Sequence, residues 1–156
     1  MDQNRIEELI QAIGSTPDIS IGAARELRAM LHDGVASTLL AAYRRSRKWR
    51  QRAWYVYLSI PYARDVRDAL TLGIEALNDK SRIVRYRACM LLAYSLKDEA
   101  LSHLEVLCAH KDPKTVEDAR AAADAIVHKN HHYYVDRNHS GRVTLSIQTA
   151  IHGEGQ

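Results

Sequence analysis

The chain has 156 residues, 46% of them hydrophobic and 26% charged, and a net charge of +3. A chain of this length and composition can bury a core of its own, which excludes an intrinsically disordered protein. No apolar run reaches the ~18 residues of a membrane-spanning helix, and the amphipathic N-terminus lacks a secretory signal pattern. We therefore expect one cytoplasmic domain over residues 1–156.

Apolar residues recur with the period of an α-helix along most of the chain, which predicts eight short amphipathic helices. Short connections predict that consecutive helices pack as antiparallel neighbours. Asp18 or Ser20 is predicted to cap the second helix, Pro61 to close the fourth and Pro113 to begin the eighth. The eight apolar faces lie within residues 6–13, 24–31, 35–43, 53–60, 66–77, 84–95, 101–108 and 116–127.

The helical pattern stops after Asn130. In the segment that follows, Val143, Leu145 and Ile147 alternate with polar residues, which is the period of a half-buried strand. A turn-rich NHSG sequence precedes them. These features predict that the helical array over about residues 3–130 is covered at its end by a small β-hairpin over 131–150.

The chain also contains an internal repeat. The segment DKSRIVRYRA, Asp79–Ala88, recurs as DPKTVEDARA, Asp112–Ala121, at a spacing of about 33 residues that is typical of stacked helical repeats. A weaker copy, RKWRQRA at Arg47–Ala53, precedes Arg82–Ala88 by a slightly longer interval, and Arg44 then stands where this copy should carry its Asp. Self-similarity with such a period indicates helical units that stack on one another.

The two clear copies resemble the first helix of HEAT-like repeats, especially the short bacterial type found in phycobilisome-lyase-like proteins. The resemblance covers about residues 19–129 and implies an all-α, right-handed stack of antiparallel helical hairpins, a HEAT-like α-solenoid. It also implies that the shared Asp and Arg positions tie a loop to the next helix. The residues that carry the resemblance are Asp79, Ile83, Arg87 and Ala88, and Asp112, Val116, Arg120 and Ala121.

Positive charge is concentrated in the middle of the chain. Residues 44–87 hold 12 Lys/Arg and only 4 Asp/Glu, a local charge of +8, which leaves −5 for the rest. With two tryptophans among them, these cations form a predicted basic, Trp-bearing face that binds a partner. The face is composed of Arg44, Arg45, Arg47, Lys48, Trp49, Arg50, Trp54, Arg82 and Arg85.

Three interpretations of this face remain open. An acidic protein suits it, since Arg pairs with carboxylates and Trp and Arg are frequent anchors in interfaces. Clustered cations beside aromatic rings also suit nucleic acid, and the resemblance adds a damaged-base glycosylase as an alternative. However, Thr115, Glu117 and Asp118 replace the cations in the last unit, which argues against a continuous groove for nucleic acid. The third interpretation is a solvated basic helix end without a partner.

No motif in the chain indicates catalysis or a cofactor. His128 and His132 have a spacing that can chelate a metal, but Asn130 is expected to end the helix first, so we expect no metal site. A match of Asp136–Gly141 to a calcium loop lacks the final Glu and is better explained as a turn. The two cysteines, Cys89 and Cys108, are expected to be free thiols. We therefore expect a non-enzymatic protein–protein interaction module.

Overall fold

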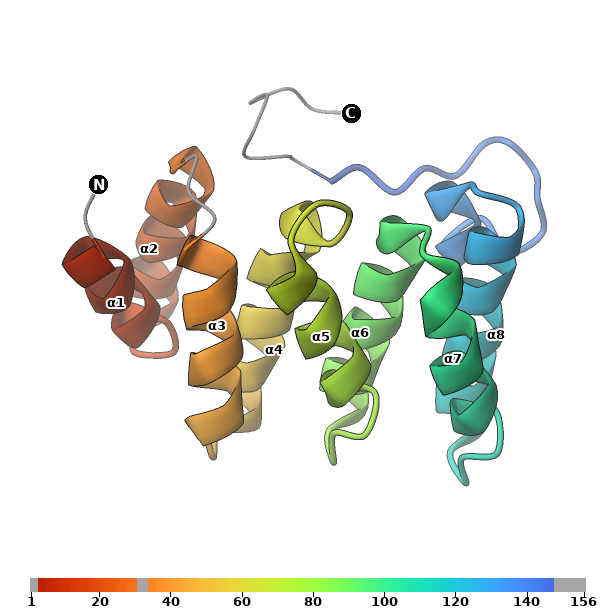
Figure 1. Ribbon diagram of the computed structural model, residues 1–156, viewed down its shortest axis with the longest axis horizontal. Coiled ribbons are helices and arrows are strands. Elements are labelled where there is room, and N and C mark those ends of the chain that lie inside the picture. Colours follow the sequence, from red (N-terminus) through yellow and green to blue (C-terminus); the bar gives the residue numbers. More distant parts are fainter. Residues whose placement is uncertain (1–2, 31–33, 148–156) are drawn as a thin grey trace.

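The computed structural model describes residues 3–30 and 34–147, and within them the chain is all-helical. Figure 1 shows the helices as a row of pairs, with α1, α3, α5 and α7 nearer the viewer and the others behind them. Three short 3-10 segments, Ile60–Tyr62, Asp98–Ala100 and His131–Tyr134, lie between or after the helices. The α-helices are α1 (Gln3–Ala12), α2 (Pro17–Ala29), α3 (Gly34–Arg45), α4 (Trp49–Ser59), α5 (Arg67–Ala76), α6 (Arg82–Ser95), α7 (Leu101–Leu107) and α8 (Pro113–Val127).

The helix boundaries follow local signals, with one correction. The expected cap of α2, Asp18 or Ser20, is wrong: Thr16 is the N-cap, and its side chain accepts a hydrogen bond from the Ile19 N–H. Pro17 occupies the first turn, where a missing N–H costs nothing, so the helix starts earlier than expected. The expected role of Pro113 is confirmed, and Asp112 caps α8 in front of it.

Each helical pair packs on the next one, and the α3–α4 and α5–α6 pairs do so through both of their helices. Contacts join α3 to α5 in the near layer, and α4 to α6 and α6 to α8 in the far layer. The buried apolar side chains form one continuous core along the row. Gly73 permits the close packing of α5 on α6, because a Cβ at this position would lie 2.5 Å from Leu91 Cδ2. The helices are therefore held by a shared core that runs through the described part of the chain.

The C-terminal β-hairpin expected over residues 131–150 is wrong for residues 131–147, which form no strand; residues 148–150 lie outside the described part. Instead, His131–Tyr134 form a 3-10 turn, and the chain then returns along the upper edge of the row (Figure 1). Tyr134 is fully buried, and its hydroxyl donates a 2.7 Å hydrogen bond to the Tyr86 carbonyl in α6. Val143, which we expected to cover the last helix, is 47% exposed. Packing on α6 and α8, rather than pairing of strands, holds this segment.

Candidate functional site

Two largely buried ion pairs join the second helical pair to the third and the third to the fourth. In both, an arginine of one pair's second helix reaches the aspartate in the loop of the following pair. Arg52 Nε lies 2.8 Å from Asp79 Oδ2, and Arg85 Nη2 lies 3.3 Å from Asp112 Oδ2. The two arginines are as far apart along the chain as the two aspartates are. We call these two pairs the Arg–Asp ladder.

The ladder corrects the alignment of the weaker repeat copy. The structural period is the interval between Asp79 and Asp112, which is shorter than the interval that placed Arg52 opposite Arg87. Arg52 therefore corresponds to Arg85, and Ser46 rather than Arg44 stands at the Asp position. A search for arginines 27 residues before each repeat aspartate would have found this arrangement in the sequence.

Of the four Asp and Arg positions that we expected to be structural, the aspartates form the ladder and the arginines do not. Arg87 lies over the ring of Tyr57, 5.2 Å from its centroid. Arg120 is exposed and forms no ion pair within the described residues. The loop-to-helix tie therefore exists, but its arginines come from the preceding unit.

Asp79 is the more completely bonded of the ladder carboxylates. It accepts hydrogen bonds from Arg52, from the Tyr43 hydroxyl at 2.8 Å and from the Ser81 N–H at 2.9 Å. Burial disfavours its ionised form, but these hydrogen bonds outweigh burial and hold the pKa of Asp79 below its usual value. The same bonding and burial raise the pKa of the Tyr43 hydroxyl.

In the last unit a carboxylate replaces the ladder arginine. Asp118 occupies the position that Arg85 holds in the unit before, and it is 3% exposed. Arg137 of the C-terminal segment donates to Asp118 Oδ1 at 3.0 Å, and Arg82 lies 3.7 Å from Oδ2. At this end of the row the carboxylate therefore comes from α8 and the arginine from the C-terminal segment. The resulting ion pair attaches that segment to α8.

The nine residues of the predicted face lie in different environments. Arg85 is only 7% exposed and is taken up by the ladder, and Arg82 lies beside Asp118, so neither belongs to a free basic surface. Trp54 packs partly against the core, edge-on to Tyr57. It points away from Trp49 because five residues turn a helical side chain by about 140°.

The other predicted residues remain together at the α3–α4 junction. Trp49 is 39% exposed, with the Arg50 guanidinium 5.4 Å from its ring centroid. Arg44 is exposed but forms a two-point ion pair with Glu75 of α5. We call the remaining exposed set the basic loop surface, which consists of Arg45, Arg47, Lys48, Trp49 and Arg50.

An open cleft of about 580 Å³ lies beside the basic loop surface, between the α3–α4 and α5–α6 loops. Its acidic groups are already paired, Glu75 with Arg44 and Asp79 with Arg52. Arg47 and Lys80 also line it, and neither forms an ion pair within residues 3–30 and 34–147. The cleft therefore carries positive charge that the described part of the protein does not neutralise.

The Asp136–Gly141 segment, which we expected to be a turn rather than a calcium loop, is closed by hydrogen bonds to its own first residue. The Asp136 carboxylate accepts hydrogen bonds from Ser140 N–H at 3.0 Å, Ser140 Oγ at 2.7 Å and Gly141 N–H at 2.8 Å. Asp136 is 3% exposed, and these bonds lower its pKa. The turn expected here is confirmed, although it joins no strands.

The side chains of His128 and His132 do not point toward a common site, because the helix ends before both of them. α8 ends at Val127, and the His132 ring accepts a hydrogen bond from the Leu145 N–H. His128 turns instead toward Asp124. Both cysteines are free thiols, as expected, with Cys89 fully buried and Cys108 partly so.

No family model matches this chain, and no curated protein matches it significantly in sequence. Among the helices of the described residues, none is both long and apolar enough to cross a membrane.

Proposed function

We propose that this protein is a non-enzymatic, HEAT-like helical scaffold that binds an acidic protein partner through the basic loop surface. The repeated Arg–Asp ladder and the packing of each helical pair on the next support a solenoid of the HEAT-like kind. In such a scaffold the loops between the two helices of each pair lie along one edge of the row. The residues of each loop then determine which partner that part of the edge binds.

The observation that carries the proposal is unneutralised charge beside an exposed aromatic ring. Arg45, Arg47, Lys48 and Arg50 form no ion pair within the described residues. The neighbouring carboxylates of Glu75 and Asp79 are occupied by other arginines. Exposed Trp and Arg side chains are the commonest anchors of protein interfaces, and carboxylates of a partner would complete the pairing.

A protein partner accounts for the shape of this surface better than nucleic acid does. A groove that follows a phosphate backbone needs cations along its whole length. Here the exposed, unneutralised cations cluster at the α3–α4 junction beside Trp49, and the early turns of α8 carry the exposed Glu117 and the buried Asp118. A compact basic patch fits a local acidic surface of a folded protein.

The test is a pull-down from the source cell with three forms of the full chain. The loop variant carries Arg47→Ala, Lys48→Ala and Arg50→Ala, and retains Trp49. Its matched control loses the same charge at three exposed residues that form no ion pair with any residue in the described ranges, which are Arg25, Lys97 and Arg142. Proteins recovered by the wild type and the control but lost with the loop variant identify the partner, and we expect them to be acidic. Equal recovery by all three forms would exclude this surface as the interface.

Binding to duplex DNA is the second measurement. A nucleic-acid binder must weaken with salt by about 0.9 in logarithmic slope for each phosphate contact. We expect no binding that survives physiological salt. Salt-dependent DNA binding that the loop variant abolishes and the control retains would replace the protein partner with nucleic acid.

A further inference from the structure

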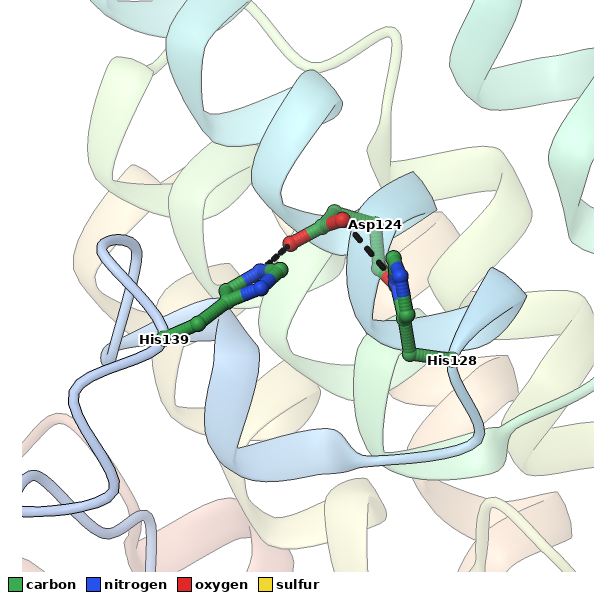
Figure 2. Close-up of side chains that lie close together, drawn as sticks. All are labelled: Asp124, His128 and His139. Carbon is green, nitrogen blue, oxygen red and sulfur yellow. Dashed lines mark hydrogen bonds and ion pairs between the residues drawn. The ribbon is translucent and has the colours of Figure 1, made fainter.

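Three side chains of metal-ligating type converge at the junction of α8 and the C-terminal segment (Figure 2). Asp124 lies in the last turn of α8, His128 follows the helix end, and His139 comes from the turn after the 3-10 segment. One ligand atom of each lies within 4.8 Å of the other two. Within the described residues this is the only such cluster of three.

The Asp124 carboxylate stands between the two imidazoles, as Figure 2 shows. Its Oδ2 lies 2.5 Å from His139 Nε2, and its Oδ1 lies 3.1 Å from His128 Nδ1. Ligands bound to Zn²⁺ tetrahedrally at 2.0–2.1 Å lie about 3.3 Å from one another. The His128 contact is close to this spacing, and the His139 ring has to withdraw from the carboxylate by about 0.8 Å to reach it. The three ligand atoms, which lie within 4.8 Å of one another, also have to turn toward a common centre.

His139 is held in place by its surroundings. Its backbone has φ of 54°, in the left-handed region, and the hydrogen bonds of the Asp136–Gly141 turn that contains it fix this conformation. The Tyr133 ring stacks on the imidazole with 3.8 Å between centroids, nearly parallel. His139 therefore points at Asp124 from an ordered turn, so little freedom is left to lose when a ligand binds.

The side chains of the cluster are also open to solvent. His139 is 37% exposed, His128 50% and Asp124 32%. An ion can therefore enter without unfolding, and water can complete its coordination. Two imidazoles and one carboxylate suit a borderline divalent transition metal rather than Ca²⁺ or Mg²⁺, which prefer oxygen ligands.

We propose that Asp124, His128 and His139 bind one divalent transition-metal ion, with Zn²⁺ as the representative, and that the ion fastens the C-terminal segment to α8. To present lone pairs to the ion, His128 Nδ1 gives up its hydrogen bond to the Asp124 carbonyl, and His139 Nε2 gives up its hydrogen bond to the Asp124 carboxylate. In each ring the displaced hydrogen moves through solvent to the other nitrogen, or leaves as a proton where both nitrogens carry one. The sequence did not reveal this cluster, because His139 lies fifteen residues from Asp124 along the chain. This site is separate from the basic loop surface, so either proposal can fail alone.

Calorimetric titration of the untagged, metal-free full chain with Zn²⁺ at neutral pH tests the site. We expect one ion per chain, and a visible absorption typical of tetrahedral coordination when Co²⁺ is used instead. His139→Asn removes the imidazole but keeps a residue that tolerates positive φ, and should weaken binding at least tenfold. His103→Gln, at an exposed histidine of α7, is the matched control and should bind as the wild type does.

Limited trypsin digestion tests the fastening. We expect Zn²⁺ to slow cleavage after the exposed Arg142 several-fold in the wild type and not in His139→Asn. The variant also controls for any effect of Zn²⁺ on the protease. The proposal is overturned by three results: no binding by the wild type, equal weakening in His139→Asn and His103→Gln, or tight binding without protection of Arg142. Metal-free melting curves of both variants show whether either substitution disturbs the fold itself.

Discussion

Asp79 connects three parts of the molecule through one buried carboxylate. It receives Arg52 from α4, Tyr43 from α3 and the Ser81 N–H at the start of α6. Its side chain is 4% exposed, so no water replaces these partners when one is lost. Asp79 therefore adds a buried polar link between the second and third helical pairs to the core that they share.

Asp79→Ala should lower the free energy of unfolding by about 3–5 kcal/mol, because the Arg52 guanidinium is then left without its carboxylate in a largely buried site. Denaturant titration measures the change. Asp65→Ala, at an exposed aspartate without an ion pair within the described residues, should change stability by less than about 0.5 kcal/mol. Equal effects of the two substitutions would mean that the ladder contributes nothing specific.

The stability that Asp79 contributes should also depend on pH. Its pKa is lower in the folded than in the unfolded protein, so the unfolded state binds the proton first as the pH falls. The contribution is complete above the unfolded pKa of about 3.9 and is lost as the pH falls through the folded value. We therefore expect the stability difference between wild type and Asp79→Ala to shrink in strong acid.

The two thiols should differ in reactivity. Cys89 is fully buried, and burial raises its pKa, so the reactive thiolate is scarce and inaccessible. A thiol reagent should therefore modify only Cys108 in the native protein and both cysteines after denaturation. Cys108→Ser should abolish the native reaction, and a persistent reaction would show that the core opens around Cys89.

At the scale of elements, the C-terminal segment serves as the end of the helical row. Tyr134 packs on Tyr86 of α6 with ring centroids 5.4 Å apart, and Ile147 joins the core. Arg137 supplies the charge that the buried Asp118 requires. The segment thus covers the end of the row, where a further helical pair would otherwise pack. The arginine that pairs with α8 lies in an irregular turn of this segment and not in a helix.

Truncation after Asn130 should lower the melting temperature and promote self-association, because it exposes the outer side of α8 and leaves Asp118 without Arg137. Tyr134→Ala in the full chain should by itself cost about 3–5 kcal/mol, as for other large aromatic side chains in a core. Val143→Ser, at an exposed position of the same segment, is the control and should have little effect. Unchanged melting and a monomeric state after truncation would contradict this role.

His131 should make the attachment of this segment sensitive to acid. Its Nδ1 accepts from Arg64 at 3.2 Å, which leaves Nε2 to donate to the Leu145 carbonyl at 3.0 Å. The pKa of His131 is lowered to about 4, chiefly by burial. Repulsion by His132 and Arg64 also lowers it, whereas the hydrogen bond to the Leu145 carbonyl raises it. A proton on Nδ1 would stand directly against the Arg64 guanidinium.

Between pH of about 6.5 and 4, the unfolded chain binds a proton that folded His131 does not. Stability should therefore fall as the pH falls through this window. His131→Gln should remove this part of the pH dependence, whatever its effect at neutral pH. Melting temperatures measured across the window for the two proteins test this, and parallel curves would rule out His131 as the cause.

At the scale of the molecule, the continuous core predicts cooperative unfolding. Both tryptophans, Trp49 and Trp54, lie in α4, so their fluorescence follows one interior helix while far-UV dichroism follows all of them. Because α4 contacts α3, α5 and α6, we expect the two signals to change at the same denaturant concentration. Separate midpoints would show that the units unfold one at a time, as long repeat arrays do.

Much of the helical architecture could be predicted from the sequence alone. Helix positions follow from the helical period of the apolar residues, and the start of α8 follows from Pro113. The internal repeat similarly identified Asp79 and Asp112 as structural. These features depend on residues close together in the chain or on a pattern that recurs along it, so they are visible without coordinates.

The environment of each charged side chain was decided only by the tertiary structure. The sequence did not distinguish Arg85, which is buried against Asp112, from the exposed Arg47 and Arg50. Nor did it reveal the packing that holds residues 131–147 without strands, or the approach of His139 to Asp124. An ion pair, a buried charge and a metal site each depend on atoms that meet across long separations in the chain. Their geometry is settled only when the helices pack, since packing determines which of several similar side chains loses its water.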